Sequence, residues 1–270
     1  MRFDVPGHEP SILPEGKFSL VWADEFDGTV LDETKWDYRL SMMGRRHPAW
    51  TDKGVTLDGQ SHAVFSVVEE DGTFRSSQLQ TGRNFMDEPV KRTKFGIDDL
   101  QWPVGKLYEN KFTYRYGYVE CRCRLQQKEG WWSAFWTQSP IIGASLDPKK
   151  TGSEVDIMES FHPGDVFPHN VFTGGYGQDM QHRGVADHAV VDPNEFHRFG
   201  LLWREDEYVF YLDGAERGRI TENVSGAEAF LLISTEIIGY RSDEHRATDL
   251  IKDALDDKFI VDYVRVFKEE

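Results

Sequence analysis

The sequence has only two cysteines, no long apolar run and few positive charges. Cys121 and Cys123 stand two residues apart, and on a strand they would point to the same face, a geometry poorly suited to a disulfide. We therefore expect two small, buried, free thiols. So few cysteines also exclude a disulfide framework and a Cys-rich zinc site. No segment approaches the roughly 18 apolar residues of a transmembrane helix, and Met1 is followed by no apolar signal core.

Negative charge dominates the composition. The 31 Lys and Arg residues face 47 Asp and Glu residues, which gives a formal net charge of −16. This balance argues against a nucleic-acid-binding protein and against a polybasic membrane-surface protein, because both need a cationic surface. Nor do the nine histidines show a metal-binding spacing such as His-Glu-x-x-His.

The 270 residues are enough for one large domain or two small ones. No internal repeat, low-complexity stretch or linker marks a boundary. We therefore expect a single domain over residues 1–270, with residues 1–17 as an extended amino-terminal arm.

Short extended runs separated by Gly, Asp, Asn and Pro make up most of the chain, and long helical patterns are absent. Asp-Gly pairs at Asp58-Gly59, Asp71-Gly72 and Asp213-Gly214 are typical of hairpin turns. Many short strands at this spacing favour an all-β sandwich or barrel. One strand, 118–125, alternates between an apolar face and a face that carries Tyr118 and Glu120. That second face could be outer surface or the floor of a polar cleft.

Three carboxylates lie close together in the segment 152–161. Strict alternation puts Glu154 and Asp156 on one face of a strand and Glu159 on the other. A single β-bulge near Ile157–Met158 would return Glu159 to the face of the other two acids. A retaining glycosidase needs such a group, with an ionised nucleophile about 5 Å from a protonated acid. The alternative is an exposed acidic edge strand.

Aromatic residues precede this segment. Trp131, Trp132 and Trp136 fall within six residues, and such rings either fill a core or stack on the C–H faces of sugars. Beside the acids, a sugar-binding cleft is the better explanation for at least one of them. Tyr176, in a Gly-Gly-Tyr-Gly turn, could also stack on a sugar or cap a strand end. Trp50 ends a basic-aromatic loop, 45–50, which either contacts an acidic or sulfated sugar or is a solvated loop.

The segment Glu154-Val-Asp-Ile-Met-Glu159 resembles the Glu-x-Asp-x-x-Glu signature of glycoside hydrolase family 16. Further similar segments follow in the family's order along most of the chain: 20–36, 116–122, 130–136, 196–203, 210–214 and 261–267. The resemblance implies a curved β-jelly-roll sandwich with a substrate cleft on its concave sheet. It also implies endo-hydrolysis of a β-linked polysaccharide with retention of configuration, of the β-1,3-glucan type or an algal galactan.

Carried over by position, Glu154 would be the nucleophile, Glu159 the general acid/base and Asp156 the assisting carboxylate. The extra residue before Glu159 resembles the bulged branch of the family, which includes β-1,3-glucanases, agarases, porphyranases and carrageenases. One departure is Phe172, which stands where members often carry a histidine; His169 and His182 are the candidates to replace it.

The resemblance requires no cofactor for catalysis. Family members often bind a structural calcium ion, for which Glu25 and Asp262 are the candidate side chains. A surface acid and a polar edge residue explain these two positions equally well, so the metal stays open.

Two other functions fit the same scaffold. A non-catalytic carbohydrate-binding sandwich protein would need the tryptophans but not three acids, and a transglycosylase would share the covalent intermediate but exclude water as acceptor. We expect a secreted or periplasmic monomer with a polysaccharide as its partner, because such a polymer does not cross a membrane.

Overall fold

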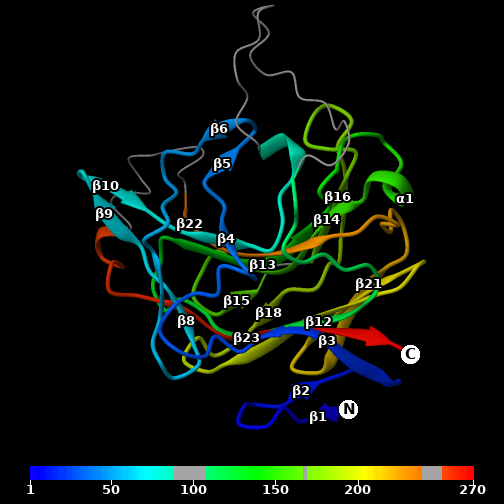
Figure 1. Cartoon of the computed structure of the whole chain (residues 1–270), viewed down its shortest axis with the longest axis horizontal. Helices are drawn as coiled ribbons and strands as arrows, with labels where there is room; N and C mark the ends of the chain where they lie inside the picture. Colours follow the sequence, from blue (N-terminus) through cyan, green and yellow to red (C-terminus); the bar gives the residue numbers. More distant parts are fainter. Residues whose placement is uncertain (88–107, 167–168, 239–250) are drawn as a thin grey trace, which may run out of the picture.

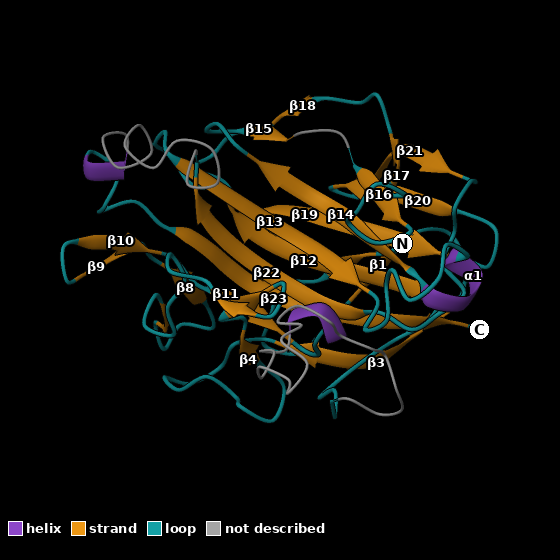
Figure 2. Cartoon of the chain, turned by 90° about the horizontal axis from the view of Figure 1, so that it is seen from above, coloured by secondary structure: helices purple, strands orange, loops and turns teal. Residues whose placement is uncertain are grey.

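The computed structural model describes residues 1–87, 108–166, 169–238 and 251–270. Two antiparallel sheets stacked face to face form the body of the molecule (Figure 1). The long strands of the two layers run in nearly the same direction (Figure 2), as in an aligned β-sandwich. Among the described residues, helix occurs only in short segments such as η1 (Phe85–Asp87) and α1 (Pro148–Thr151). The predicted all-β jelly-roll sandwich is confirmed.

The first sheet forms the upper layer in Figure 1 and carries the three acids on its central strands. Its strands, in spatial order, are β17 (Gln181–Gly184), β16 (Asn170–Thr173), β14 (Ser153–Ser160), β13 (Trp131–Gln138), β22 (Phe230–Ile237), β11 (Gln78–Gln80) and β4 (Asp37–Tyr38).

The second sheet forms the lower layer. Its strands, in spatial order, are β21 (Ala215–Ile220), β20 (Tyr208–Leu212), β19 (His197–Trp203), β12 (Gly117–Arg124), β23 (Phe259–Glu269), β8 (Ala63–Phe65) and β7 (Val55–Leu57), with β3 (Phe18–Asp24) also paired to β23.

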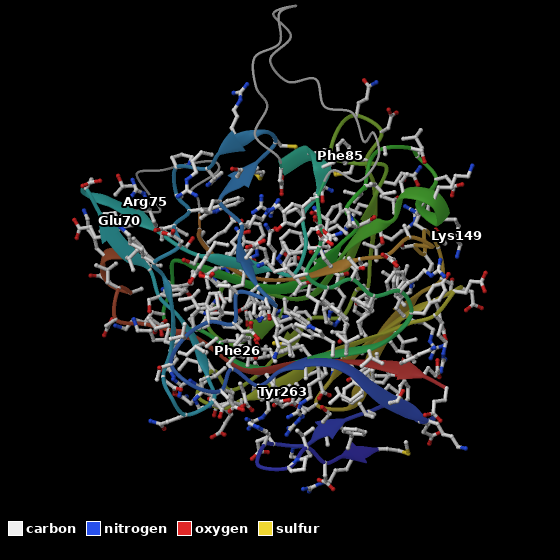
Figure 3. All side chains as sticks on the ribbon, in the orientation of Figure 1. Phe26, Glu70, Arg75, Phe85, Lys149 and Tyr263 are labelled. Carbon is white, nitrogen blue, oxygen red and sulfur yellow. The ribbon has the colours of Figure 1, made fainter. Side chains whose placement is uncertain are left out.

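Four two-stranded ribbons complete the described strands: β1 (Arg2–Phe3) with β2 (Ser11–Ile12), β5 (Ser41–Met42) with β6 (Arg45–Arg46), β9 (Val68–Glu70) with β10 (Thr73–Arg75), and β15 (Asp165–Val166) with β18 (Ala189–Val190). The β5–β6 ribbon lies above the first sheet in Figure 1, and the β1–β2 ribbon lies below the second. The β9–β10 ribbon, on which Glu70 and Arg75 are labelled in Figure 3, lies at one side of the molecule. Within the amino-terminal arm, extended segments 2–3 and 11–12 pair with each other as the β1–β2 ribbon.

The main core fills the space between the two sheets. It joins residues such as Phe135 and Ile233 of the first sheet to Val119, Phe199 and Val264 of the second, and all five are fully buried. Cys121 and Cys123 belong to this core as free thiols, as predicted. Alternation along each strand places the remaining side chains on the outer faces, where the first sheet carries the acids.

The polar face of β12 is an outer face covered by the amino-terminal ribbon. Glu120 is fully buried there and accepts hydrogen bonds from the backbone N–H of Ile12 (3.2 Å) and the hydroxyl of Tyr263 (2.8 Å). Figure 3 shows Tyr263 at the lower sheet, on the side of this ribbon. Burial raises the pKa of Glu120. This face is therefore neither open surface nor the floor of a cleft.

Candidate active site

A β-bulge brings the three acids onto one face of β14. Asp156 lies opposite Trp136 of β13, and Met158 lies opposite Phe135, so Ile157 is the extra residue between them. Ile157 and Met158 both turn into the core and are fully buried. The predicted bulge is confirmed, and it returns Glu159 to the outer face of the sheet.

The neighbouring strands supply the floor on which these acids stand. On β13, Ala134 lies opposite Glu159 on one side and Ser234 of β22 on the other. The small Ala134 and Ser234 side chains leave space beside Glu159. Larger residues flank this row, with Trp136 opposite Asp156 and Trp132 of β13 opposite Glu236 of β22.

A pocket of about 490 Å³ opens over this floor. All three acids line it, together with a fourth carboxylate, Glu236, and one arginine, Arg39. The rest of its wall is mainly aromatic and methionine side chains: Met42, Met43, Trp132, Trp136, Phe161, Phe172, Tyr176 and Met180. A polar floor with apolar walls is typical of a sugar-binding site, where hydroxyls meet the polar groups and ring C–H faces meet the apolar ones.

Two donors hold Glu154 in place. Its Oε2 atom accepts hydrogen bonds from the Gln138 amide (3.0 Å) and from the Tyr176 hydroxyl. Burial raises the pKa of Tyr176 well above its usual value, and the nearby Glu154 adds to the shift, so the phenol keeps its proton and donates. Tyr176 comes from a loop in which Gly175 has a φ of 82°, and a Cβ on Gly143 would lie 2.8 Å from the Gly175 Cα. This close backbone contact joins the Tyr176 loop to the segment around Gly143, which follows β13.

Asp156 stands between the two glutamates and is 7% exposed. Burial raises its pKa well above the usual value, and the carboxylates of Glu159 and Glu154 raise it further. All of these effects favour the neutral carboxylic acid form of Asp156 over its charged form. The Glu159 Oε2 atom accepts a hydrogen bond of 2.9 Å from the side-chain amide of Asn170 on β16.

A second polar network lies on the opposite side of the pocket. Gln78 donates to Glu236 Oε1 (3.0 Å) and accepts from Arg39 (3.3 Å). Arg39 is ion-paired with Asp87 at 2.7 Å, and its guanidinium lies 5.2 Å from the centre of the Trp136 ring. These hydrogen bonds fix Glu236 and Arg39 as part of a rigid wall.

The three tryptophans of segment 131–136 lie on two different sides of β13. Trp132 and Trp136 line the pocket, and Trp132 stacks on Phe161 with a centroid distance of 4.9 Å. Trp131 faces the other side of β13, is fully buried in the core, and donates its indole N–H to the carbonyl of Ala254 (3.2 Å). The expectation that Trp131 contacts substrate is wrong, because the sheet separates it from the pocket.

Trp50 is also buried, with 1% of its surface exposed, and it lies outside the pocket wall. Its ring stacks on His47 at 4.0 Å, and the Arg39 guanidinium lies 5.1 Å from its centre. Trp50 therefore packs against Arg39. Because its ring is buried outside the pocket wall, it cannot contact a sugar in the pocket. Tyr176 does line the pocket, but its hydroxyl is bound to Glu154, a role that its turn position did not indicate.

The two histidines lie in different places. His169 is buried behind the bulge, 2.6 Å from the carbonyl oxygen of Ile157 and stacked on Phe210. His182 lies on β17, where its ring stacks on Phe172 at 4.8 Å and its Nε2 atom is 2.8 Å from the Asn170 Oδ1 atom. Neither histidine lines the pocket.

The two candidate calcium ligands are each paired with an arginine. Glu25 makes a two-point ion pair with Arg265, at 2.7 and 2.8 Å, and Asp262 pairs with Arg122. The described residues hold no group of three or more His, Cys, Asp or Glu side chains that could bind a metal ion. In this structure both candidate carboxylates are therefore engaged by arginine side chains.

Gln138, Asn170, Glu236 and Arg39 are pocket or supporting residues that the sequence reasoning missed. Alternation along 131–138 does put Gln138 on the face of Trp132 and Trp136, so this signal was available. The other residues enter the site through cross-strand pairing and loop packing, which a single sequence does not reveal.

Known proteins resemble this chain over most of its length. Glucan endo-1,3-beta-glucosidase A1 of Niallia circulans is 25% identical over 279 residues, which cover 93% of this chain and 38% of that protein. Beta-porphyranase B of Zobellia galactanivorans is 25% identical over 238 residues, covering 80% of this chain and 72% of that protein. The chain thus spans well under half the length of the first of these relatives.

Solved structures share the fold. SCLam, a non-specific endo-beta-1,3(4)-glucanase, superposes with a TM-score of 0.68 at 21% identity, covering 100% of this chain and 97% of that chain. The catalytic domain of an endo-1,3-beta-glucanase from Thermotoga petrophila RKU-1 gives a TM-score of 0.65 at 21% identity, covering 94% and 99%. In addition, the model of the family described as glycosyl hydrolases family 16 matches residues 60–235, more than half of the chain. With the ordered motifs and the bulged acidic strand, this match shows that the chain belongs to glycosyl hydrolase family 16.

Proposed function

We propose that this protein is an endo-acting retaining glycosidase that cleaves a β-linked polysaccharide. The observation that carries the proposal is the bulge at Ile157. It places the side chains of Glu154, Asp156 and Glu159 in the same pocket, which has apolar walls. A carbohydrate-binding protein without catalysis would gain nothing from three carboxylates on one strand, since their mutual repulsion is costly.

In the proposed reaction, Glu154 attacks the anomeric carbon while Glu159 gives its proton to the glycosidic oxygen. The C–O bond breaks, the leaving sugar departs with its new hydroxyl, and a glycosyl ester forms on Glu154. Glu159 then takes a proton from water, which attacks the ester and releases Glu154. In its neutral form, which burial and the neighbouring carboxylates favour, Asp156 can donate a hydrogen bond to one of the two glutamates and so lowers the negative charge of the group.

The pocket favours a neutral polymer, and we propose a β-1,3-linked glucan as substrate. Four carboxylates line the pocket, and the one arginine among its lining residues is already paired with Asp87. A sulfated galactan would bring further negative charge to this wall. The relative from Niallia circulans, which aligns with 93% of this chain, carries endo-1,3-beta-glucosidase in its name.

A polysaccharide panel with product analysis tests this function. Laminarin, mixed-linkage glucan, agarose, porphyran and carrageenan are incubated with the protein, and the products are separated by size. We expect oligosaccharides of several lengths early in the reaction with laminarin, as an endo-acting enzyme gives. Products longer than the starting chains would identify a transglycosylase, and binding without cleavage of any polymer would contradict the proposal.

We further propose that the protein works as a monomer outside the cytoplasm, where such polymers occur. No helix of the described residues is long and apolar enough to cross a membrane. Light scattering coupled to gel filtration gives the solution mass, for which we expect the 31.2 kDa of one chain.

A further inference from the structure

A hydrogen-bonded chain of two side chains reaches Glu159 from the edge of the first sheet. Asn170, the first residue of β16, lies opposite Asp156. Its side-chain nitrogen donates to Glu159 Oε2 over 2.9 Å, and its side-chain oxygen is 2.8 Å from Nε2 of His182 on β17. Glu159 lies beyond the last β14–β16 pair, Asp156 with Asn170, and this side-chain contact links it to β16.

The chemistry of the three groups fixes the direction of this chain. An amide oxygen only accepts hydrogen bonds, so the Nε2 atom of His182 must carry a proton and donate it to Asn170 Oδ1. The amide is then oriented with its NH₂ group toward Glu159.

Neighbouring residues contact both Asn170 and His182, although His182 lies on the exposed edge strand β17. The His182 ring stacks on Phe172, a residue of the pocket wall, with an interplanar angle of 23°. Gly184 lies opposite Asn170 on β17, and a Cβ added there would be 3.1 Å from Asn170 Oδ1 and 3.6 Å from the His182 ring. A side chain at position 184 would therefore push against both members of the chain.

We propose that Asn170 and His182 are positioning residues that assign the two oxygens of Glu159 different tasks. The inference rests on the proposed function, in which Glu159 is the acid/base. Oε2 is held as an acceptor by Asn170, so the transferable proton sits on Oε1. When Oε1 gives this proton to the glycosidic oxygen, the C–O bonding pair passes to that oxygen and Glu159 becomes an anion. The Asn170 hydrogen bond is then charge-assisted and stronger, so it stabilises the transition state more than the ground state.

The dependence of kcat/KM on the leaving group distinguishes this positioning role from a purely structural one. A phenyl β-glycoside of a β-1,3-linked glucose disaccharide needs protonation of its leaving oxygen, whereas the dinitrophenyl β-glycoside does not. We expect Asn170→Ala to lower kcat/KM about 10- to 100-fold on the phenyl glycoside, the range for losing one hydrogen bond to a charged group. On the dinitrophenyl glycoside we expect a change of less than about threefold. His182→Leu should act in the same sense with a smaller loss, and His182→Gln, whose amide can donate to Asn170, should recover most of it.

Arg183 provides the matched control. It follows His182 on β17, is exposed, and pairs with Glu222 at 2.7 Å, away from the pocket. Arg183→Leu should leave both substrates unchanged. Equal losses on both substrates for Asn170→Ala, or a loss of the same pattern in Arg183→Leu, would overturn the inference. If Glu159→Ala itself shows no preference for the dinitrophenyl glycoside, the proposed function fails first. If Glu159→Ala shows that preference and Asn170→Ala does not, only the positioning role is refuted.

Discussion

Trp131 and Trp132 are neighbours in the chain and lie on opposite faces of β13. Trp131 is fully buried in the core, where its indole N–H binds the Ala254 carbonyl, while Trp132 lines the pocket and stacks on Phe161. Two identical side chains on one strand therefore have different surroundings: Trp131 lies in the core and Trp132 lies in the pocket wall.

The two tryptophans should respond to truncation in opposite ways. Trp131→Ala should lower the free energy of unfolding by about 3–5 kcal/mol, because it leaves a large cavity in the core. Trp132→Ala should cost much less stability and should weaken laminarin binding, since a sugar ring would lose its stacking partner. Urea unfolding and affinity electrophoresis in laminarin gels measure the two effects. Equal stability losses and unchanged binding for Trp132→Ala would contradict the assignment of Trp132 to the pocket wall.

The Tyr176 hydroxyl offers a test of how Glu154 is held. Tyr176→Phe keeps the ring but removes a donor to Glu154 Oε2. We expect kcat to fall about 10- to 100-fold with little change in KM, because the lost interaction is a hydrogen bond to a reacting carboxylate. Tyr176→Ala also removes the apolar wall, so its KM should rise as well. Steady-state kinetics on laminarin distinguish the two, and a fully active Tyr176→Phe variant would show that the hydroxyl does not position the nucleophile.

The length of the bulge can be changed by one residue in either direction. Deleting Ile157 shortens the segment to Glu-x-Asp-x-Glu, which keeps all three acids on one face of a regular strand, so we expect a folded protein with partial activity. Inserting one glycine after Ile157 lets Glu159 return to the same face in a regular strand, but one residue pair further along the strand from Asp156. The two glutamates would then lie too far apart for a retaining enzyme, so we expect activity to be abolished. Activity is compared per folded molecule, as judged by near-ultraviolet circular dichroism. An insertion variant that is as active as the deletion variant would argue against the need for the bulge.

We expect the buried side chain of His169 to make the free energy of unfolding depend on pH. Burial lowers its pKa from 6.5 to about 4. Between these values the unfolded chain binds more protons than the folded one, so stability must fall as the pH falls through this range. Its share of the loss should be about 2 kcal/mol between pH 7 and pH 5.

His169→Asn provides the comparison, because its amide can still donate to the Ile157 carbonyl while it does not titrate. Urea unfolding at pH 7 and pH 5 should show a smaller loss for the variant, and the difference between the two proteins isolates His169. The same loss in both would show that His169 does not carry this dependence.

Periodicity along single strands accounts for what could be predicted from the sequence. Alternation in 154–159 is broken in a way that only a bulge repairs, and alternation in 131–138 places Trp132 and Trp136 on one face. Whether that face points into the core or lies beside the three acids depends on how β13 pairs with β14. Residues distant in the chain determine this pairing. For this reason the sequence could not tell which of the three tryptophans lies in the core, and the places of Trp50, Asn170 and Glu236 could be assigned only from the structure.

In the proposed mechanism, Glu154 is the nucleophile and Glu159 is the general acid/base. The products formed in the presence of azide test these two roles directly. Each residue is replaced by alanine, and each variant is given azide and a dinitrophenyl β-glycoside. With Glu159→Ala, azide should displace Glu154 from the glycosyl ester and yield the β-glycosyl azide, by two inversions. With Glu154→Ala, azide should attack the substrate directly, expel dinitrophenolate and yield the α-glycosyl azide. Proton NMR reads the configuration, and the opposite pair of products, or the same anomer from both variants, would contradict the account.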